Sequence, residues 1–132
     1  MRPGDPIDGN VLMLAAAKAS VPPRRLAPLV DRVRAALPDV ERFRRRYEVA
    51  YENDETVAFF VDDGFWADVG EDVGLDDREI DAVRRAHHEQ LIWTGKRHDR
   101  RAEFETALEV RDCVVLANEE TENGETERTR RQ

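Results

Sequence analysis

Apolar residues at helical spacing, interrupted by prolines, constrain the fold of this chain more than any other feature. Between Pro23 and Pro38, five aliphatic residues fall on one face of a helix: Leu26, Leu29, Val30, Val33 and Leu37. Pro23 suits the first turn of such a helix, and Pro38 ends it because proline cannot continue the hydrogen-bond ladder. The pattern therefore predicts an amphipathic helix between these two prolines.

Further helices are predicted on both sides of this one. The cluster Asp8-Gly9-Asn10 is typical of a helix start, and residues 11–17 are apolar around most of the helix circumference. We expect this first helix to be buried on several sides. Pro38-Asp39 begins a third helix, which continues with Val40, Phe43, Tyr47 and Tyr51 at helical spacing.

Residues 47–61 allow two interpretations. Tyr47, Val49 and Tyr51 alternate with polar residues, and so do Val57, Phe59 and Val61, with Asn53-Asp54 between the two runs. A β-hairpin of strands near 47–52 and 56–61 has this pattern. A helix that runs to about Glu52, followed by one strand, has it too. The apolar run at 113–116 is a second candidate partner for the strand at 56–61.

The second half of the chain is again helical in pattern. A short helix is expected from Phe65 to its stop at Gly74, and Asp76 or Asp77 then caps the longest helix, with Glu79 near its third position. We expect Gly95 to end that helix and Asp99 to cap a further one.

These patterns predict an α+β fold that is predominantly α-helical, with about five to six helices and a minor β element. The chain has 132 residues, enough for one domain. We expect a flexible N-terminus at 1–6, a single globular domain at 7–117 and a disordered polar tail at 118–132. No apolar run approaches the roughly 18 residues of a membrane-spanning helix, so no membrane partner is expected.

The charge composition points to a protein that works in concentrated salt. There are 29 acidic residues against 21 basic ones, a net charge of -8, and Lys18 and Lys96 are the only lysines. In molar salt the Debye length falls to about 3 Å, which screens repulsion among carboxylates, while arginine still forms forked pairs with them. An acidic protein from a GC-rich genome is the alternative. Cys113 is the only cysteine, which favours a reducing, cytoplasmic location.

Charge is unevenly distributed along the chain. Residues 24–46 hold eight arginines against three acids, a balance of +5, and residues 48–81 hold thirteen acids against one arginine, a balance of -12. The structural interpretation is that the two segments lie near each other in the fold. The functional alternative is a nucleic-acid-binding face made of Arg24, Arg25, Arg42, Arg45 and Arg46. Salt disfavours this alternative because phosphate contacts weaken steeply as salt rises.

Residues for catalysis, cofactor binding or metal binding do not form a recognisable pattern. His87 and His88 are adjacent and His98 is eleven residues beyond His87, about 16 Å along a continuous helix, so they do not share a metal. His87 falls on an apolar stripe and is expected in the core. Cys113 borders an apolar run, and no phosphate-binding loop or serine elbow is present. We predict no catalytic, cofactor or metal residues. A metal-dependent enzyme that uses the histidines is the third hypothesis.

Two adjacent pairs of large apolar residues favour a protein partner. The side chains of Phe59-Phe60 and of Phe65-Trp66 must point to different faces of a strand or helix. We expect at least one of each pair to need cover from a second chain, which makes a partner protein or a homodimer reasonable. The leading hypothesis is a non-catalytic, cytoplasmic protein-interaction or regulatory module adapted to high salt.

Three segments carry a resemblance: Gly74-Leu75-Asp76-Asp77-Arg78-Glu79, Arg85-Ala86-His87 and Glu103-Phe104-Glu105-Thr106-Ala107-Leu108-Glu109. With them the chain resembles small uncharacterised acidic proteins of halophilic archaea, over roughly residues 7–117. The resemblance implies a halophilic source and a cytosolic location. It brings no activity, cofactor or catalytic residue to carry over.

Overall fold

The computed structural model describes residues 6–118, which form six helices and three strands. In chain order these are α1 (Gly9–Ala19), α2 (Pro23–Ala36), α3 (Val40–Arg46), β1 (Glu48–Glu52), β2 (Thr56–Val61), α4 (Phe65–Val73), α5 (Asp77–Arg97), α6 (Arg101–Leu108) and β3 (Asp112–Ala117). The predicted α+β fold, predominantly helical with a minor β element, is confirmed. Apart from Pro6 and Asn118, the predicted flexible N-terminus and polar tail lie outside the described residues.

Several helix ends lie where the sequence places them. Asp8 caps α1 by accepting a hydrogen bond from the Asn10 N–H at 2.8 Å, and Asp39 caps α3 in the same way. Asp76 and Glu79 form a reciprocal capping box at the start of α5. Gly74 ends α4 with a φ of 76°, a left-handed conformation that favours glycine. These ends depend on local chemistry, which is why the sequence reveals them.

The expected stop at Gly95 is wrong, because α5 continues to Arg97. Gly95 is instead the place where α6 packs closely against α5. A Cβ at this position would lie 2.8 Å from Cδ2 of Phe104 and 3.0 Å from Cα of Arg101. Asp99 does not cap α6 either, since it lies in the turn with a φ of 59° and Arg100 occupies the capping position.

The hairpin interpretation of residues 47–61 is confirmed, and the alternative of a helix running to about Glu52 is wrong. α3 ends at Arg46, and β1 then pairs antiparallel with β2, with Val49 opposite Phe59. β3 pairs antiparallel with the other side of β2, with Val115 opposite Ala58. Both candidate partners of residues 56–61 are therefore real, and β2 is the central strand of the order β1-β2-β3.

Helices cover both faces of the central strand. Phe59 stacks on Phe43 of α3 at a centroid distance of 5.4 Å, whereas Phe60 meets Phe104 of α6 edge-on at 6.5 Å. The expectation that one of these two phenylalanines needs a second chain is therefore wrong, since each is buried by a helix of its own chain.

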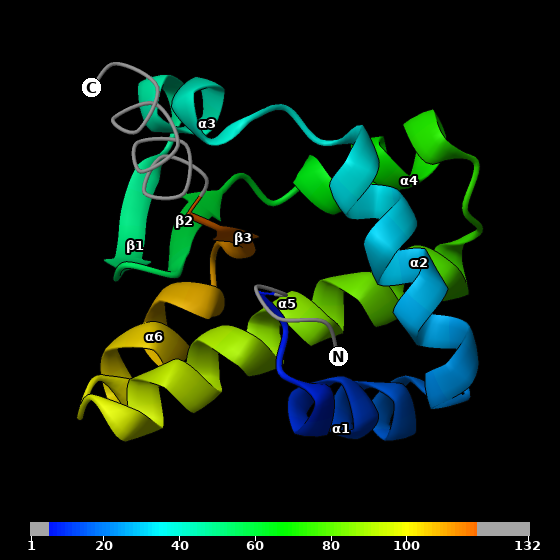
Figure 1. Ribbon diagram of the computed structural model, residues 1–132, viewed down its shortest axis with the longest axis horizontal. Helices are drawn as coiled ribbons and strands as arrows, with labels where there is room; N and C mark the ends of the chain where they lie inside the picture. The colour runs from blue at the N-terminus through cyan, green and yellow to red at the C-terminus, as the bar shows by residue number, and fades with distance from the viewer. Residues whose placement is uncertain (1–5, 119–132) are drawn as a thin grey trace, which may run out of the picture.

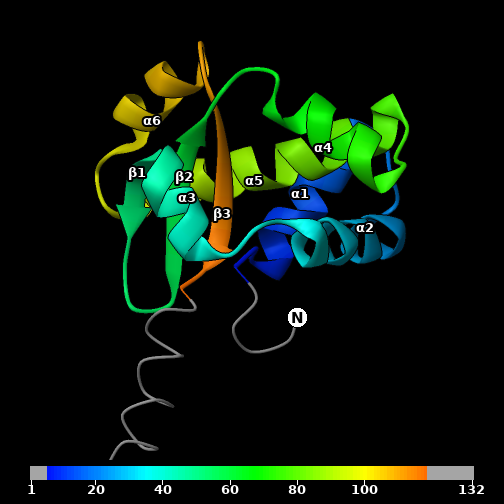
Figure 2. The same cartoon turned by 90° about the horizontal axis from the view of Figure 1, so that it is seen from above.

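The long helix α5 joins two halves of the molecule. The sheet and α6 lie at one end, α1, α2 and α4 lie at the other, and α5 packs against elements of both (Figures 1 and 2). Within residues 6–118, no helix has the length and apolar character to cross a membrane.

Candidate functional site

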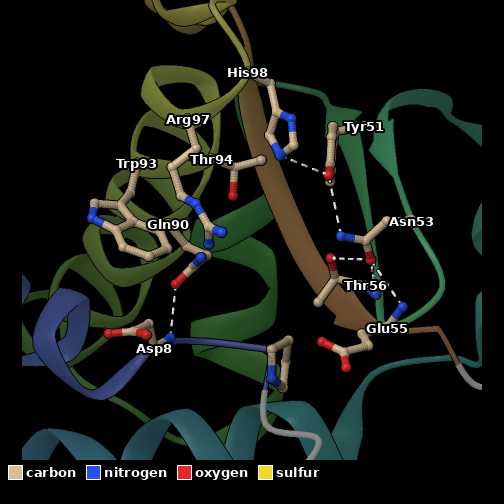
Figure 3. A pocket seen from close by; sticks show the side chains of 11 residues that line it. Asp8, Tyr51, Asn53, Glu55, Thr56, Gln90, Trp93, Thr94, Arg97 and His98 are labelled. Atoms are coloured by element: carbon tan, nitrogen blue, oxygen red, sulfur yellow. Dashed lines mark hydrogen bonds between the residues drawn. The ribbon is translucent and has the colours of Figure 1, made fainter.

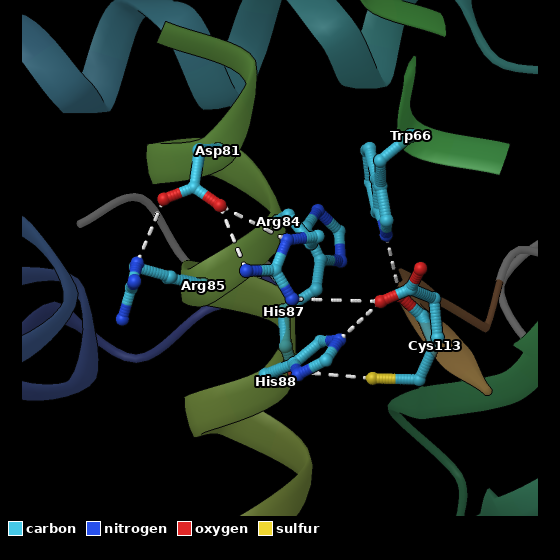
Figure 4. A network of polar contacts seen from close by, with 8 residues as sticks. Trp66, Asp81, Arg84, Arg85, His87, His88 and Cys113 are labelled. Carbon is cyan, nitrogen blue, oxygen red and sulfur yellow. Dashed lines mark hydrogen bonds and ion pairs between the residues drawn. The ribbon is translucent and has the colours of Figure 1, made fainter. Parts of the chain in front are cut away.

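The structure places His87 in the core, at the outer edge of β3. Only 3% of the residue is exposed, and its Nδ1 accepts the N–H of Val115 at 2.9 Å. The Trp66 indole donates to the carbonyl of Cys113 on the same edge at 3.1 Å (Figure 4). Burial, with smaller contributions from the charges of His88 and Arg34, lowers the pKa of His87 from 6.5 to about 3. The ring is therefore neutral at ordinary pH and serves as a main-chain acceptor.

His88 points into a network of charged side chains between α5 and β3. Its Nε2 lies 2.7 Å from Oδ1 of Asp112, and Arg84 approaches the same oxygen at 3.6 Å (Figure 4). Asp81 accepts from Arg84 and Arg85. Burial alone would raise the pKa of Asp81, but the hydrogen bonds from the two arginines outweigh it and hold that pKa below its usual range.

The three histidines do not meet. His98 lies at the far end of α5, with its Nε2 3.1 Å from the Tyr51 hydroxyl. In the described part of the chain, no three His, Cys, Asp or Glu side chains are arranged to hold a metal ion. Cys113 is fully buried, and this burial, together with the nearby Asp112 carboxylate, raises the pKa of its thiol.

The five arginines of the nucleic-acid hypothesis fall into two groups. Arg24 and Arg25 lie in the first turn of α2, and the other three lie on α3. The fourteen residues of α2 separate the groups by about 20 Å at 1.5 Å per residue. Arg25 is also occupied, since its guanidinium donates to Glu79 at 3.0 Å. The structure does not gather these residues into one patch, and nucleic-acid binding stays a prediction.

Two of the five arginines, Arg42 and Arg46, instead line an apolar groove of about 360 Å³ between α3 and α4. This α3–α4 groove is lined by Ala36, Leu37, Pro38, Arg42, Phe43, Arg46, Tyr47, Asp62, Gly64, Phe65, Asp68, Val69, Asp72 and Val73. Its floor is built from aromatic rings, with Phe65 6.0 Å from Phe43 and 6.1 Å from Tyr47 between centroids. Tyr47, Phe65 and Val69 are only half-buried, so the floor is open to solvent.

Charges of opposite sign flank the groove. Arg42 and Arg46 stand on the α3 wall, Asp68 and Asp72 stand on the α4 wall, and Asp62 lies in the connection just before α4. Among residues 6–118, none of these five side chains makes an ion pair, although Arg46 lies over the Tyr47 ring at 5.4 Å. The basic and acidic segments of the chain do lie side by side, as the structural interpretation of the charge asymmetry predicts. Their charges at the groove remain available to a partner.

Only part of this groove could be predicted from the sequence. Of the adjacent pair Phe65-Trp66, Trp66 is buried against His87, with 4.7 Å between ring centroids, while Phe65 stays half-exposed in the groove. Its own chain thus covers Phe65 only in part, and cover of this residue by a second chain stays a prediction. The sequence identified Arg42 and Arg46 but grouped them with distant arginines, because the facing aspartates come from a separate helix.

Fold and groove together define a small α+β domain with an open apolar groove between charged walls. The chain belongs to the family described as a domain of unknown function, DUF8048, whose model matches residues 5–118. No curated protein and no solved structure matches the chain.

Proposed function

We propose that this protein is a non-catalytic interaction module that binds an amphipathic helix of a partner protein in the α3–α4 groove. The observation that carries the proposal is the half-exposed aromatic and aliphatic floor between two charged walls. Exposed apolar surface rimmed by polar groups is typical of a protein-binding site. A groove of this kind suits a helix that inserts one apolar face.

The groove's own geometry describes the partner. Phe65, Val69 and Val73 repeat every four residues along α4, and its nine residues span about 13 Å, or two to three helical turns. The partner helix presents apolar residues at matching intervals, with acidic residues toward Arg42 and basic residues toward Asp68. Such complementary charges fix orientation and favour encounter more than they add affinity.

The proposal extends to a cytoplasmic setting with concentrated salt. Acids outnumber bases by 29 to 21, and arginine supplies the cation of most ion pairs in the described chain. At a Debye length of about 3 Å only direct charge contacts persist, so the apolar floor supplies most of the binding free energy. A halophilic source accounts for this design.

Nucleic-acid binding is the second candidate, favoured by the positions of Arg42, Arg45 and Arg46 on one helix. None of the three makes an ion pair with another residue of 6–118. The aspartates across the groove oppose it, because they repel phosphate.

A matched pair of variants tests the proposal. Val69→Asp puts a charge on the groove floor, and Val110→Asp makes the same change at a side chain that is 74% exposed elsewhere. Tagged full-length wild type and both variants are crosslinked in their native cells, and bound proteins are measured by quantitative mass spectrometry. We expect a stoichiometric partner with wild type and Val110→Asp, and its loss with Val69→Asp.

Thermal melts of the three proteins verify that each is folded. Retention of the same partner by Val69→Asp would contradict the groove as the binding site. Recovery of nucleic acid alone, lost on Arg42→Glu with Arg46→Glu, would favour the second candidate.

A further inference from the structure

A second pocket, of about 180 Å³, lies where the last turns of α5 face the turn between β1 and β2 (Figure 3). Residues just before α1 complete its wall. Three segments far apart in the sequence thus meet around one small space. None of its lining residues belongs to the α3–α4 groove.

One wall of this α5-end pocket offers hydrogen-bond donors. Gln90, Thr94 and Arg97 are spaced i, i+4 and i+7 on one face of α5. The Gln90 side-chain oxygen accepts the Asp8 N–H at 2.7 Å, which leaves the amide N–H groups of Gln90 for other partners. Thr94 and Arg97 point into the same space in Figure 3.

Arg97 is held in place but not neutralised. Its guanidinium lies 4.9 Å from the centre of the Trp93 ring, and it makes no ion pair with another described residue. The next two arginines along the chain behave differently, since Arg100 pairs with Glu103 at 2.7 Å and Arg101 with Glu105 at 2.9 Å. An arginine without a carboxylate stands out in this part of the molecule.

The opposite wall carries a carboxylate that is equally unpaired. Glu55, in the turn between β1 and β2, makes no ion pair within the described chain, although it lines the same pocket as Arg97. The other acid of the pocket is engaged, because Asp8 caps the Asn10 N–H. His98 is engaged as well, through its contact with the Tyr51 hydroxyl. The pocket therefore keeps one cation and one anion that do not reach each other.

We propose that the α5-end pocket binds a small zwitterion of the α-amino-acid class. Its carboxylate accepts from the Arg97 guanidinium and the Thr94 hydroxyl, its ammonium group lies against Glu55, and its side chain contacts the Trp93 ring. Arginine's planar fork suits a carboxylate. A ligand with both charges satisfies both walls, whereas a simple anion leaves Glu55 unpaired and facing it. This site is independent of the groove and of its partner.

The experiment uses the two tryptophans as reporters in a full-length, ¹⁵N-labelled chain. Trp93 lies at the pocket. Trp66 serves as an internal reference, because it is 2% exposed and its indole is hydrogen-bonded to the Cys113 carbonyl. Alanine, leucine and phenylalanine are titrated while both indole N–H signals are followed by NMR. Leucine is compared with 4-methylpentanoate, which lacks the ammonium group, and with 3-methylbutylamine, which lacks the carboxylate.

We expect the Trp93 signal to shift saturably with at least one amino acid, while the chemical shift of Trp66 stays constant. If leucine binds, both of its analogues should bind at least tenfold more weakly. Arg97→Met and Glu55→Gln should each weaken amino-acid binding at least tenfold, whereas Arg101→Met on α6 should leave it unchanged. Failure of all three amino acids to saturate the signal overturns the proposal. So does equal binding of 4-methylpentanoate and leucine, or unchanged binding by the Arg97→Met and Glu55→Gln variants.

Discussion

His87 accepts a hydrogen bond from a main-chain N–H that has no partner within the sheet. β3 is an outer strand, and the N–H of Val115 points away from β2 toward α5. A buried N–H without an acceptor costs about 1–3 kcal/mol, and the neutral imidazole supplies a lone pair at this place. A protonated ring has no lone pair to offer, so the contact couples the fold to pH.

Mild acid should therefore weaken the fold through His87. Its pKa falls from an ordinary 6.5 to about 3 in the folded state, so the unfolded chain binds the extra proton between these values. Stability is complete above about pH 6.5 and declines as pH falls toward 3, by at most about 1.4 kcal/mol per pH unit, the limit for one proton. Urea unfolding at pH 7.5, 6.5 and 5.5 measures this decline before most carboxylates titrate.

Two variants isolate this effect from the other histidines. His87→Gln keeps an oxygen acceptor and should flatten the pH dependence between 5.5 and 6.5, at some cost in packing. His98→Gln, at an exposed ring, should retain it. An unchanged slope in His87→Gln would show that another group titrates in this window.

The apolar stripe of α5 could predict that His87 is buried, and it did. The stripe could not predict the partner of the ring, because nothing local marks β3 as an outer strand. The same limit applies to Trp66, whose indole bonds to a carbonyl 47 residues away.

Contact between α5 and α6 depends on the absence of a side chain at Gly95. In an ordinary helix interior, glycine to alanine stabilises by about 0.5–1 kcal/mol. Here the added Cβ would lie 3.0 Å from main-chain Cα of Arg101 and 2.8 Å from Phe104, so we expect Gly95→Ala to destabilise by about 1–3 kcal/mol. Urea unfolding gives the difference in free energy.

Gly64 provides the control, since a Cβ there meets no atom within 4 Å. Gly64→Ala should change stability little. A Gly95→Ala protein as stable as wild type would mean that α6 does not pack against α5 this closely.

Helices and strands were predictable to the extent that their signals are local. The capping box of Asp76 and Glu79 uses adjacent residues and was visible in the sequence. The choice between helix and strand at residues 48–52 was not, because the spacing of Tyr47 and Tyr51 fits both. Pairing with β2 decides it, and strand preference depends on such neighbours. The role of Gly95 was predicted wrongly because, in a sequence, a glycine that lets a second helix pack closely cannot be distinguished from a glycine that ends a helix.

Added salt should stabilise the protein as a whole. With a net charge of -8, raising KCl from about 0.1 to 1 M shortens the Debye length from about 10 to 3 Å and screens repulsion among the acids. We expect the Tm to rise, with a smaller rise in the triple variant Asp54→Asn, Asp63→Asn, Asp77→Asn, whose three acids are exposed. Calorimetry across the two salt concentrations tests this, and a Tm that falls would mean that the arginine–carboxylate pairs outweigh the repulsion.

The α3–α4 groove is a feature of the whole molecule that the sequence could predict only in part. Charge counting suggested that the basic and acidic segments lie close together, and they do. It could not show that Arg42 and Asp68 line the same apolar groove, because that arrangement depends on how α3 and α4 pack around Phe43 and Phe65.

The two outer strands differ in whether their outer main-chain groups already have hydrogen-bond partners. On β3, the carbonyl of Cys113 and the N–H of Val115 are already bonded to side chains of α4 and α5. On β1, no strand of residues 6–118 pairs with the side away from β2. Edge-to-edge association is therefore self-limiting: two copies joined through β1 would form a continuous sheet bounded at both ends by β3. Such a joining would give a closed pair rather than an open-ended fibre.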